Sequence, residues 1–194
     1  MTVDFRQLLE SLPARAEPGR SLHEARLKNE LRAMLEAHEA DGPIQMLRIT
    51  GEAPYAVTGY DVMLSTPHLL YQCFARWLPA PGVLALMMAG KLSAESLALG
   101  RLLPLRVELG PTHPDRAHEP NITVLDHRVC HPAVLGPALC YAERWDPTQL
   151  VAELLQEIAA LLRFERAADL ARPLNKQAGA WFAGGHKGFD LPLR

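Results

Sequence analysis

The 194-residue sequence has only three cysteines, Cys73, Cys130 and Cys140, and none of them belongs to a Cys-x-x-Cys pair. This small, odd number argues against a disulfide-based scaffold and against a zinc ribbon. It is typical of a protein that is kept in a reducing compartment.

The sequence also lacks a long hydrophobic run. Its most apolar stretch, residues 83–89, is far shorter than the ~20 residues that a membrane-spanning helix needs. The first ten residues include Asp4 and Glu10, where a signal peptide has a basic start and an apolar run. We therefore expect a soluble cytoplasmic protein without a membrane partner.

Neither sign of charge is in large excess. Lysine and arginine total 20 and aspartate and glutamate total 22, which gives a formal net charge of -2. Without a basic surplus the sequence does not indicate nucleic-acid binding. Hydrophobic residues make up 48% and charged residues 22%, as in an ordinary globular protein. The length suits one domain with a real core.

The clearest N-terminal element is a helix that starts after Ser21. Ser21 and Glu24 form a Ser-x-x-Glu capping box, and Asp41-Gly42-Pro43 ends the helix. Apolar residues recur at helical spacing on one face: Leu27, Leu31, Met34 and Leu35. Before this helix, residues 1–20 are predicted to be an N-terminal extension with a short helical turn and a Pro/Gly linker.

Strand patterns follow in the middle of the chain. Alternating apolar and polar residues, or runs of β-formers, predict strands at residues 44–50, 55–64, 103–109 and 121–129. Tyr60, Val62 and Leu64 are expected on one face of the second strand. The order of a helix, then strands, then helices predicts an α+β fold with an antiparallel sheet of about four strands.

The C-terminal part is predicted to be helical. Asp146 suits an N-cap and Pro147 suits the first helical position, and a wide apolar stripe follows over residues 150–162. A last short helix is expected from about Asn175. Residues 184–194 are expected to form a flexible tail.

Four short motifs follow one another after the fourth predicted strand. They are His131-Pro132-Ala133, the Gly136 to Cys140 stretch, Trp145-Asp146-Pro147 and Pro173-Leu174-Asn175. In this order, residues 103–182 resemble the ubiquitin-conjugating enzyme family, and the helix after Ser21 resembles the family's N-terminal helix. Two departures, Ala133 in place of asparagine and Arg172 near an expected acidic position, are similar to the divergent bacterial branch.

The resemblance implies a ubiquitin-conjugating-like domain over residues 21–183, in which residues 66–100 fit no family element and are interpreted as an insertion. It implies that Cys140 accepts a ubiquitin-like protein from an activating enzyme as a thioester and passes it to an amine on an unidentified target. It further implies a bacterial antiviral-defence pathway. No cofactor and no metal are expected.

The resemblance also places residues around the predicted catalytic cysteine. His131, Trp145 and Asn175 are candidate supporting residues, and Asp146, Glu143 or Asp169 would orient or deprotonate the amine. His131 has two interpretations, as a general base or as a structural histidine bonded to nearby backbone. With Ala133 present, the oxyanion donor must lie elsewhere, and backbone near Cys140 is one option.

Other interpretations of these residues stay open. Cysteine is among the most buried residue types, so Cys140 alone would suit a core position in an unrelated α+β scaffold. A conjugating-like fold that only presents binding partners is the second alternative, favoured by Ala133 and Arg172. The residues His113, His118, His127 and Cys130 show no recognised metal-ligand spacing.

Overall fold

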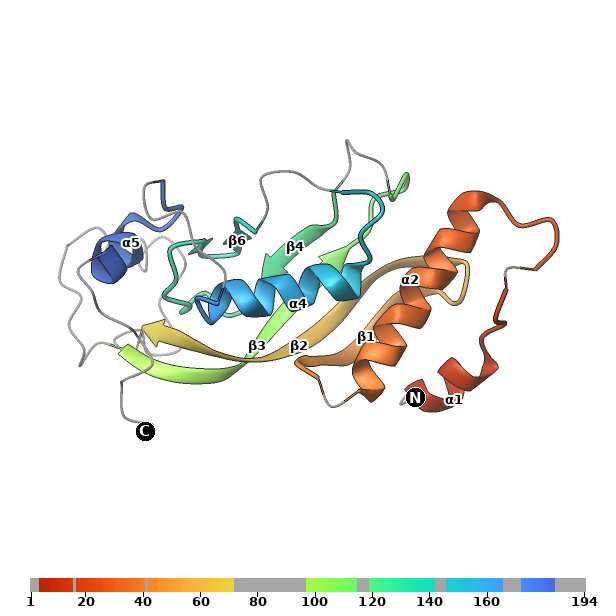
Figure 1. The fold of residues 1–194 in the computed structure, drawn as a ribbon, viewed down its shortest axis with the longest axis horizontal. Helices are drawn as coiled ribbons and strands as arrows, with labels where there is room; N and C mark the ends of the chain where they lie inside the picture. Colours follow the sequence, from red (N-terminus) through yellow and green to blue (C-terminus); the bar gives the residue numbers. More distant parts are fainter. Residues whose placement is uncertain are drawn as a thin grey trace. The chain divides into compact units, whose positions relative to one another are not determined.

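The computed structural model describes residues 4–15, 17–40, 42–71, 97–114, 119–141, 146–165 and 172–183. Figure 1 shows the elements, which in chain order are α1 (Phe5–Ser11), α2 (Leu22–Glu39), β1 (Ile44–Glu52), β2 (Ala56–Tyr71), β3 (Leu97–Glu108), β4 (Asn121–Val124), β5 (Val134–Leu135), β6 (Ala138–Leu139), α4 (Val151–Leu162) and α5 (Lys176–Ala183). The predicted α+β class, with an N-terminal helix and a four-stranded antiparallel sheet, is confirmed. No helix among the described residues is long and apolar enough to cross a membrane.

Helix α2 begins at the predicted capping box. The Ser21 hydroxyl accepts a hydrogen bond from the Glu24 amide, and the Glu24 carboxylate accepts one from the Ser21 amide. These two bonds satisfy donors that the first helical turn otherwise leaves unpaired. The predicted apolar face is also confirmed, since Leu27, Leu31, Met34 and Leu35 are all buried.

The main sheet has the strand order β1-β2-β3-β4. β1 pairs with β2 in antiparallel register, with Ile44 opposite Leu64. The predicted alternation is confirmed on two strands, because Tyr60, Val62 and Leu64 of β2 and Leu103, Leu105 and Val107 of β3 are all buried. On β3 these buried side chains alternate with the less buried Pro104, Arg106 and Glu108, as expected for a sheet that is covered on one face.

β4 is shorter than predicted. It ends at Val124, whereas the sequence predicts a strand over residues 121–129. The reason is local: the carboxylate of Asp126 accepts hydrogen bonds from the Arg128 backbone amide and guanidinium, which bends the chain into a turn. An aspartate that bonds backbone two residues ahead competes with strand pairing.

The contacts between residues divide the chain into two compact units, each built from three separated segments. The first unit comprises Met1–Ser65, Pro104–Ile122 and Ala142–Glu157. The second unit comprises Thr66–Leu103, Thr123–Tyr141 and Ile158–Arg194. Strands β2, β3 and β4 and helix α4 contribute residues to both units.

The predicted N-terminal extension packs within the first unit. Helix α1 lies against α2 through an ion pair of 2.8 Å between Arg6 and Glu39. The linker after α1 is held by the buried ammonium group of Lys28, which donates to the carbonyl oxygens of Pro13 and Ala14 at 3.2 and 3.3 Å. Burying this charge is tolerated because the carbonyl oxygens replace its water shell.

The most buried charged group of the first unit is the Glu30 carboxylate on α2. Its Oε1 atom lies 2.8 Å from the Arg26 guanidinium and 3.1 Å from Nε2 of His113. Its Oε2 atom accepts a hydrogen bond of 2.9 Å from the backbone amide of Val151, the first residue of α4. One carboxylate thus binds all three segments of this unit.

Helix α4 begins later than predicted. The sequence predicts its start at Asp146-Pro147, but the helix begins at Val151. The Asp146 carboxylate accepts bonds from the amide and the hydroxyl of Thr148, and so closes a turn instead of capping the helix. The group that binds the first helical amide is Glu30, which no local sequence pattern identifies.

The segment interpreted as an insertion, residues 66–100, overlaps two strands. Residues 66–71 are the end of β2 and residues 97–100 are the start of β3. The interior of that segment lies outside the described residues, as does the predicted tail at 184–194.

The Glu30→Gln substitution is expected to lower the free energy of unfolding by about 3 kcal/mol, because it leaves the Arg26 charge without its buried partner. Urea denaturation at pH 7 measures the change. Glu36→Gln on the same helix is the matched control: Glu36 is 58% exposed and pairs with Arg32 at 3.8 Å. An exposed pair contributes under about 1 kcal/mol, so equal losses in the two variants would contradict the role of Glu30.

Candidate functional site

Cys140 is exposed and directly follows a short hairpin. β5 and β6 pair antiparallel, with Val134 opposite Leu139. The backbone amide of Cys140 donates a hydrogen bond of 2.8 Å to the carbonyl oxygen of the buried Ala133. The position of the Cys140 backbone is therefore fixed while its thiol meets solvent.

The hairpin is shaped by Gly136 and Pro137. Gly136 has a φ of 59°, which favours glycine, and the proline ring fixes the next φ near −65°. This pair is typical of a type II′ turn, the kind that joins two strands tightly. The hairpin is an element that was not predicted, although Gly-Pro between two pairs of apolar residues is its signal.

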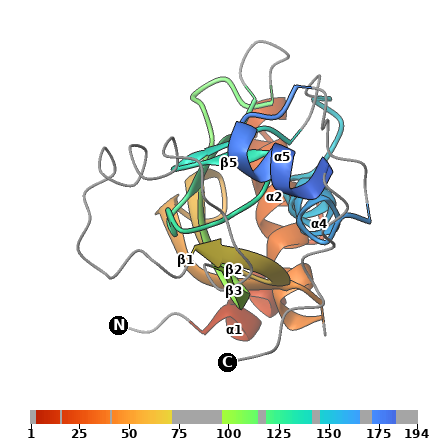
Figure 2. The same ribbon diagram turned by 90° about the vertical axis from the view of Figure 1, so that its left-hand side faces the viewer.

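The hairpin is anchored at both sides. The amide of Val124 at the end of β4 donates to the carbonyl oxygen of Pro137 at 3.0 Å. Figure 2 shows β5 beside α5, and the amide of Asn175 donates to the carbonyl oxygen of Pro132 at 2.9 Å. The bond to Pro137 holds the tip of the hairpin, and the bond to Pro132 holds the base of the loop that carries Cys140.

His131, a predicted supporting residue, is buried and bonded through both ring nitrogens. Its Nδ1 accepts a hydrogen bond of 3.1 Å from the Ala133 amide, and its Nε2 donates at 3.1 Å to the carbonyl oxygen of Leu161. Burial lowers the pKa of His131 to about 4. The ring is therefore neutral at pH 7, and its contacts are those of a structural histidine rather than of a free base.

Asn175 is also buried, and all its polar groups have partners. Its carboxamide oxygen accepts from the Ala178 amide at 3.1 Å, which caps α5. Its carboxamide nitrogen donates to the hydroxyl oxygen of Tyr71 at 3.2 Å. With its backbone bond to Pro132, Asn175 joins α5, the end of β2 and the His131 loop.

An aromatic cluster covers His131. Phe164 lies 4.6 Å from the His131 ring and 4.4 Å from the Phe182 ring, measured between ring centroids. Phe164 adopts a left-handed φ of 57° just after α4, a position that usually holds glycine. The ring contacts offset this backbone cost, which is about 1 kcal/mol. Nothing in the sequence marks Phe164 as this unusual C-cap.

Cys130 contrasts with Cys140. It is 1% exposed and packs in a core cluster with Leu69, Tyr71 and Ala178. Burial raises the pKa of the Cys130 thiol to about 11. Such a thiol is neutral and shielded from solvent, as expected for a cysteine in the core. Cys73 lies outside the described residues.

The other predicted residues are placed as follows. Asp146 is exposed, and its carboxylate already accepts two bonds from Thr148. Arg172 is exposed. Glu143, Trp145 and Asp169 lie outside the described residues. Because the Cys140 amide is bonded to Ala133, this amide is not an available oxyanion donor in the structure.

The described part of the chain contains no group of three or more His, Cys, Asp or Glu side chains arranged to hold a metal ion. His113, one of the histidines weighed for a metal, is bonded to Glu30.

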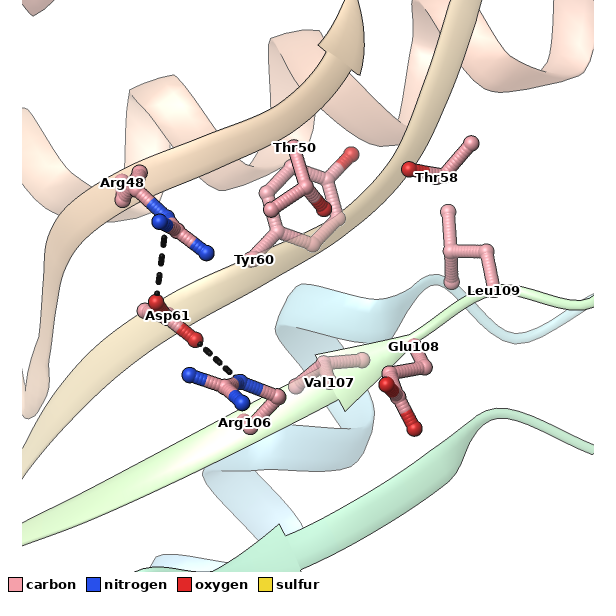
Figure 3. A pocket seen from close by; sticks show the side chains of 9 residues that line it. All are labelled: Arg48, Thr50, Thr58, Tyr60, Asp61, Arg106, Val107, Glu108 and Leu109. Atoms are coloured by element: carbon pink, nitrogen blue, oxygen red, sulfur yellow. Dashed lines mark hydrogen bonds and ion pairs between the residues drawn. The ribbon is translucent and has the colours of Figure 1, made fainter.

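A hollow of about 380 Å³ lies on the sheet of the first unit. Figure 3 shows Asp61 between two arginines in this hollow, at 3.2 Å from Arg48 and 2.8 Å from Arg106. The arginine charges are thus shared with one carboxylate, and Glu108 adds a second acidic side chain to the lining. None of the residues predicted to act with Cys140 lines this hollow.

No protein-family model matches the chain, and no curated protein matches it in sequence.

Cys140 is expected to react with iodoacetamide at pH 7.5 at least ~100-fold faster than Cys130, because only Cys140 is exposed and the Cys130 thiol is kept protonated. Peptide mass spectrometry after timed quenching measures both rates in the unmodified chain. In denaturant the two rates should converge. Equal rates in the native protein would show that the two thiols are not distinguished by burial.

Acid is expected to destabilise the protein through His131. Its pKa in the folded chain, about 4, is below the ordinary value of about 6.5, so the unfolded chain binds the proton more tightly. The contribution of the neutral His131 ring to the free energy of unfolding is fully present above pH 6.5. It falls by about 3 kcal/mol as the pH drops towards 4. Urea denaturation at several pH values measures this slope.

The His131→Asn variant should lose stability at pH 7 but show a flatter slope below pH 6.5. His127→Gln is the control, because His127 is exposed and its replacement should leave the slope unchanged. An unaltered slope in His131→Asn would mean that other groups cause the acid sensitivity.

Proposed function

We propose that this protein is a ubiquitin-conjugating-type acyl carrier, in which Cys140 holds a ubiquitin-like protein as a thioester. The observation that carries the proposal is the exposed thiol of Cys140 on an ordered backbone. A carrier thiol must be reachable by the C-terminus of another protein, and the buried Cys130 does not meet this requirement.

The element order supports a ubiquitin-conjugating-like fold. A capped N-terminal helix precedes a four-stranded antiparallel sheet, then the loop with Cys140, then the helices α4 and α5. The motif His131-Pro132-Ala133 forms the base of the Cys140 loop, and Asn175 of the Pro-Leu-Asn motif binds that base. Two motifs that are far apart in the sequence therefore support the same loop.

The proposed loading step is an exchange of thioesters. The Cys140 thiolate attacks the carbonyl carbon of the thioester on the activating enzyme, and a new carbon–sulfur bond forms at Cys140. The bond to the activating enzyme's sulfur breaks, and that sulfur takes up a proton. In transfer, an amine of the target attacks the same carbonyl, loses a proton, and expels the Cys140 thiolate.

The roles of the neighbouring residues follow from their contacts. His131 and Asn175 act as positioning residues, because their polar groups bond backbone and Tyr71 and hold the loop. The oxyanion donor comes from a group other than the Cys140 amide, which is bonded to Ala133. Asp146, on the exposed turn before α4, is the described acidic residue that we propose to orient the amine.

The similarity of these motifs to the divergent bacterial branch extends the proposal to a conjugation pathway in bacterial antiviral defence. The partners are then an activating enzyme and a ubiquitin-like protein.

A second candidate function is a binding module that presents partners without transferring an acyl group. Two observations favour it: Ala133 replaces the family's asparagine, and the amide of Cys140 is already bonded. Both reduce the stabilisation that a tetrahedral intermediate would receive at this loop.

The thioester assay tests the proposal. The protein is incubated with ATP, an activating enzyme and a ubiquitin-like protein from the same genome, and the products are run on a non-reducing gel. We expect an adduct that thiols remove and that Cys140→Ala abolishes. Cys130→Ala and Cys73→Ala are the matched controls and should retain the adduct.

The outcomes separate the two functions. A reducible adduct that requires Cys140 supports the carrier. Absence of the adduct, combined with a measurable complex between the chain and the loaded activating enzyme, would favour the binding module.

A further inference from the structure

The hollow on the sheet of the first unit lies beside a glycine that leaves space between two strands. Gly59 of β2 lies opposite Thr50 of β1. A Cβ atom added to Gly59 would lie 3.0 Å from the Thr50 hydroxyl oxygen and 3.3 Å from the Cα atom of Glu108 on β3, and it would also meet the carbonyl oxygen of Val107. No side chain therefore separates Thr50 from Glu108, which both line the hollow of about 380 Å³.

A row of charged side chains crosses the same three strands. Arg48 lies opposite Asp61 in the register of β1 and β2, and its Nε atom is 3.2 Å from Oδ2 of Asp61. The Nε atom of Arg106 on β3 is 2.8 Å from Oδ1 of Asp61. Thr50 and Glu108 each come two residues after one of these arginines, so they form a second row on the same face, roughly 7 Å along the strands. Figure 3 shows both rows, with Thr50 and Glu108 on the same side of the arginine row.

Both arginines keep hydrogen-bonding capacity for a ligand. Each contacts Asp61 through Nε, and their terminal nitrogens donate no hydrogen bond to any of the described residues. The Arg48 side chain is 61% exposed and that of Arg106 is 45% exposed, so a molecule in solvent can reach both. Each guanidinium therefore offers donors in a fixed plane, which suits a carboxylate.

Glu108 offers an acceptor on the other row. It is exposed, and its Oε2 atom accepts a hydrogen bond of 2.8 Å from the carboxamide nitrogen of Asn121 on β4. That bond holds the Glu108 carboxylate in place. Its Oε1 atom accepts no hydrogen bond from the described residues, and so can accept one from a ligand.

The charges of the lining select the ligand. The charged residues that line the hollow are Arg48, Arg106, Asp61 and Glu108, so positive and negative charges are equal in number. A doubly charged anion would be repelled by the two carboxylates, and a simple cation by the two guanidinium groups. The best match is a molecule that is negative at the arginine row and positive at Glu108.

We propose that this hollow binds the zwitterion of a small α-amino acid. The α-carboxylate accepts hydrogen bonds from the terminal nitrogens of Arg48 and Arg106. The α-ammonium group donates to Oε1 of Glu108, and the Thr50 hydroxyl lies on the same side as a further polar contact.

The length of the ligand fits the distance between the rows. The ammonium nitrogen and the carboxylate oxygens of an α-amino acid are about 3 Å apart, and a charge-assisted hydrogen bond adds about 2.8 Å at each end. The bound zwitterion thus spans roughly 8–9 Å, enough to bridge two rows that are roughly 7 Å apart. Because recognition uses only the two charged groups, the amino-acid side chain extends into solvent and contributes little to selectivity.

This site goes beyond the proposed function of Cys140 and does not depend on it. Its test uses the full chain alone, without ATP, an activating enzyme or a ubiquitin-like protein. Failure of the thioester assay would leave the amino-acid site untouched, and failure of the binding assay would leave the thioester untouched.

Nuclear magnetic resonance titration of the full chain at pH 7 tests the site, with glycine, N-acetylglycine and glycinamide as probes. Glycine should shift the Nε–H signals of Arg48 and Arg106 and the amide signals of Gly59 and Glu108, with a Kd of about 1–10 mM. N-acetylglycine, which lacks the ammonium group, and glycinamide, which lacks the carboxylate, should each bind at least ~10-fold more weakly. Alanine should bind within about twofold of glycine.

Substitutions of exposed side chains assign the two ends of the ligand. Arg48→Gln and Arg106→Gln should each weaken glycine binding about tenfold. Glu108→Gln should weaken glycine binding to a similar extent, and should make N-acetylglycine bind as well as glycine because the carboxylate that repels it is gone. Arg101→Gln is the matched control: Arg101 is an exposed arginine on the same strand that does not line the hollow, so its replacement should leave every Kd unchanged.

Four results would each overturn the proposal. The first is the absence of localised shifts in the unmodified chain up to about 50 mM glycine. The second is equal binding of glycine and N-acetylglycine in that chain, which would indicate a site for a carboxylate alone, such as a peptide C-terminus. The third is an unchanged glycine Kd in Glu108→Gln, and the fourth is an equal loss of binding in Arg101→Gln and Arg106→Gln.

Discussion

The carboxylate of Glu30 is bonded to His113 and to Val151, which lie 83 and 121 residues from it in the sequence. A buried charge is costly, and it is retained here because a guanidinium, a histidine ring and a helix amide surround it. The positive end of a helix dipole favours an anion at the first amide of α4, so Val151 is an effective partner. The start of α4, and through it the segment before the helix, depends on this one side chain.

The second unit is joined by a different pair of residues. His131 connects the loop before β5 to the end of α4, and Asn175 connects α5 to that loop and to Tyr71. Both residues belong to motifs that indicated a catalytic centre. Their contacts join the two motifs to each other and together hold the loop that carries Cys140.

Local patterns predicted the local parts of the fold well. The capping box at Ser21 and the alternation on β3 could both be predicted from the sequence, because they depend on neighbours within four residues. The start of α4 was predicted too early, because the group that binds its first amide comes from α2. The exposure of Cys140 and the burial of Cys130 were predicted through motif context rather than composition, since both cysteines lie in similar apolar surroundings in the sequence. The partner of His113 is 83 residues away and was beyond any such pattern.

The tight turn at Gly136 and Pro137 has a consequence for recognition. A flexible loop loses backbone entropy when a partner orders it, at roughly 1–2 kcal/mol for each residue. The backbone beside Cys140 is already ordered by the turn and by its bonds to Val124 and Asn175, so most of that loss occurs when the chain folds. A protein that bound at this loop would therefore lose little backbone entropy there, and a small contact area would suffice, as the proposed exchange between successive partners requires.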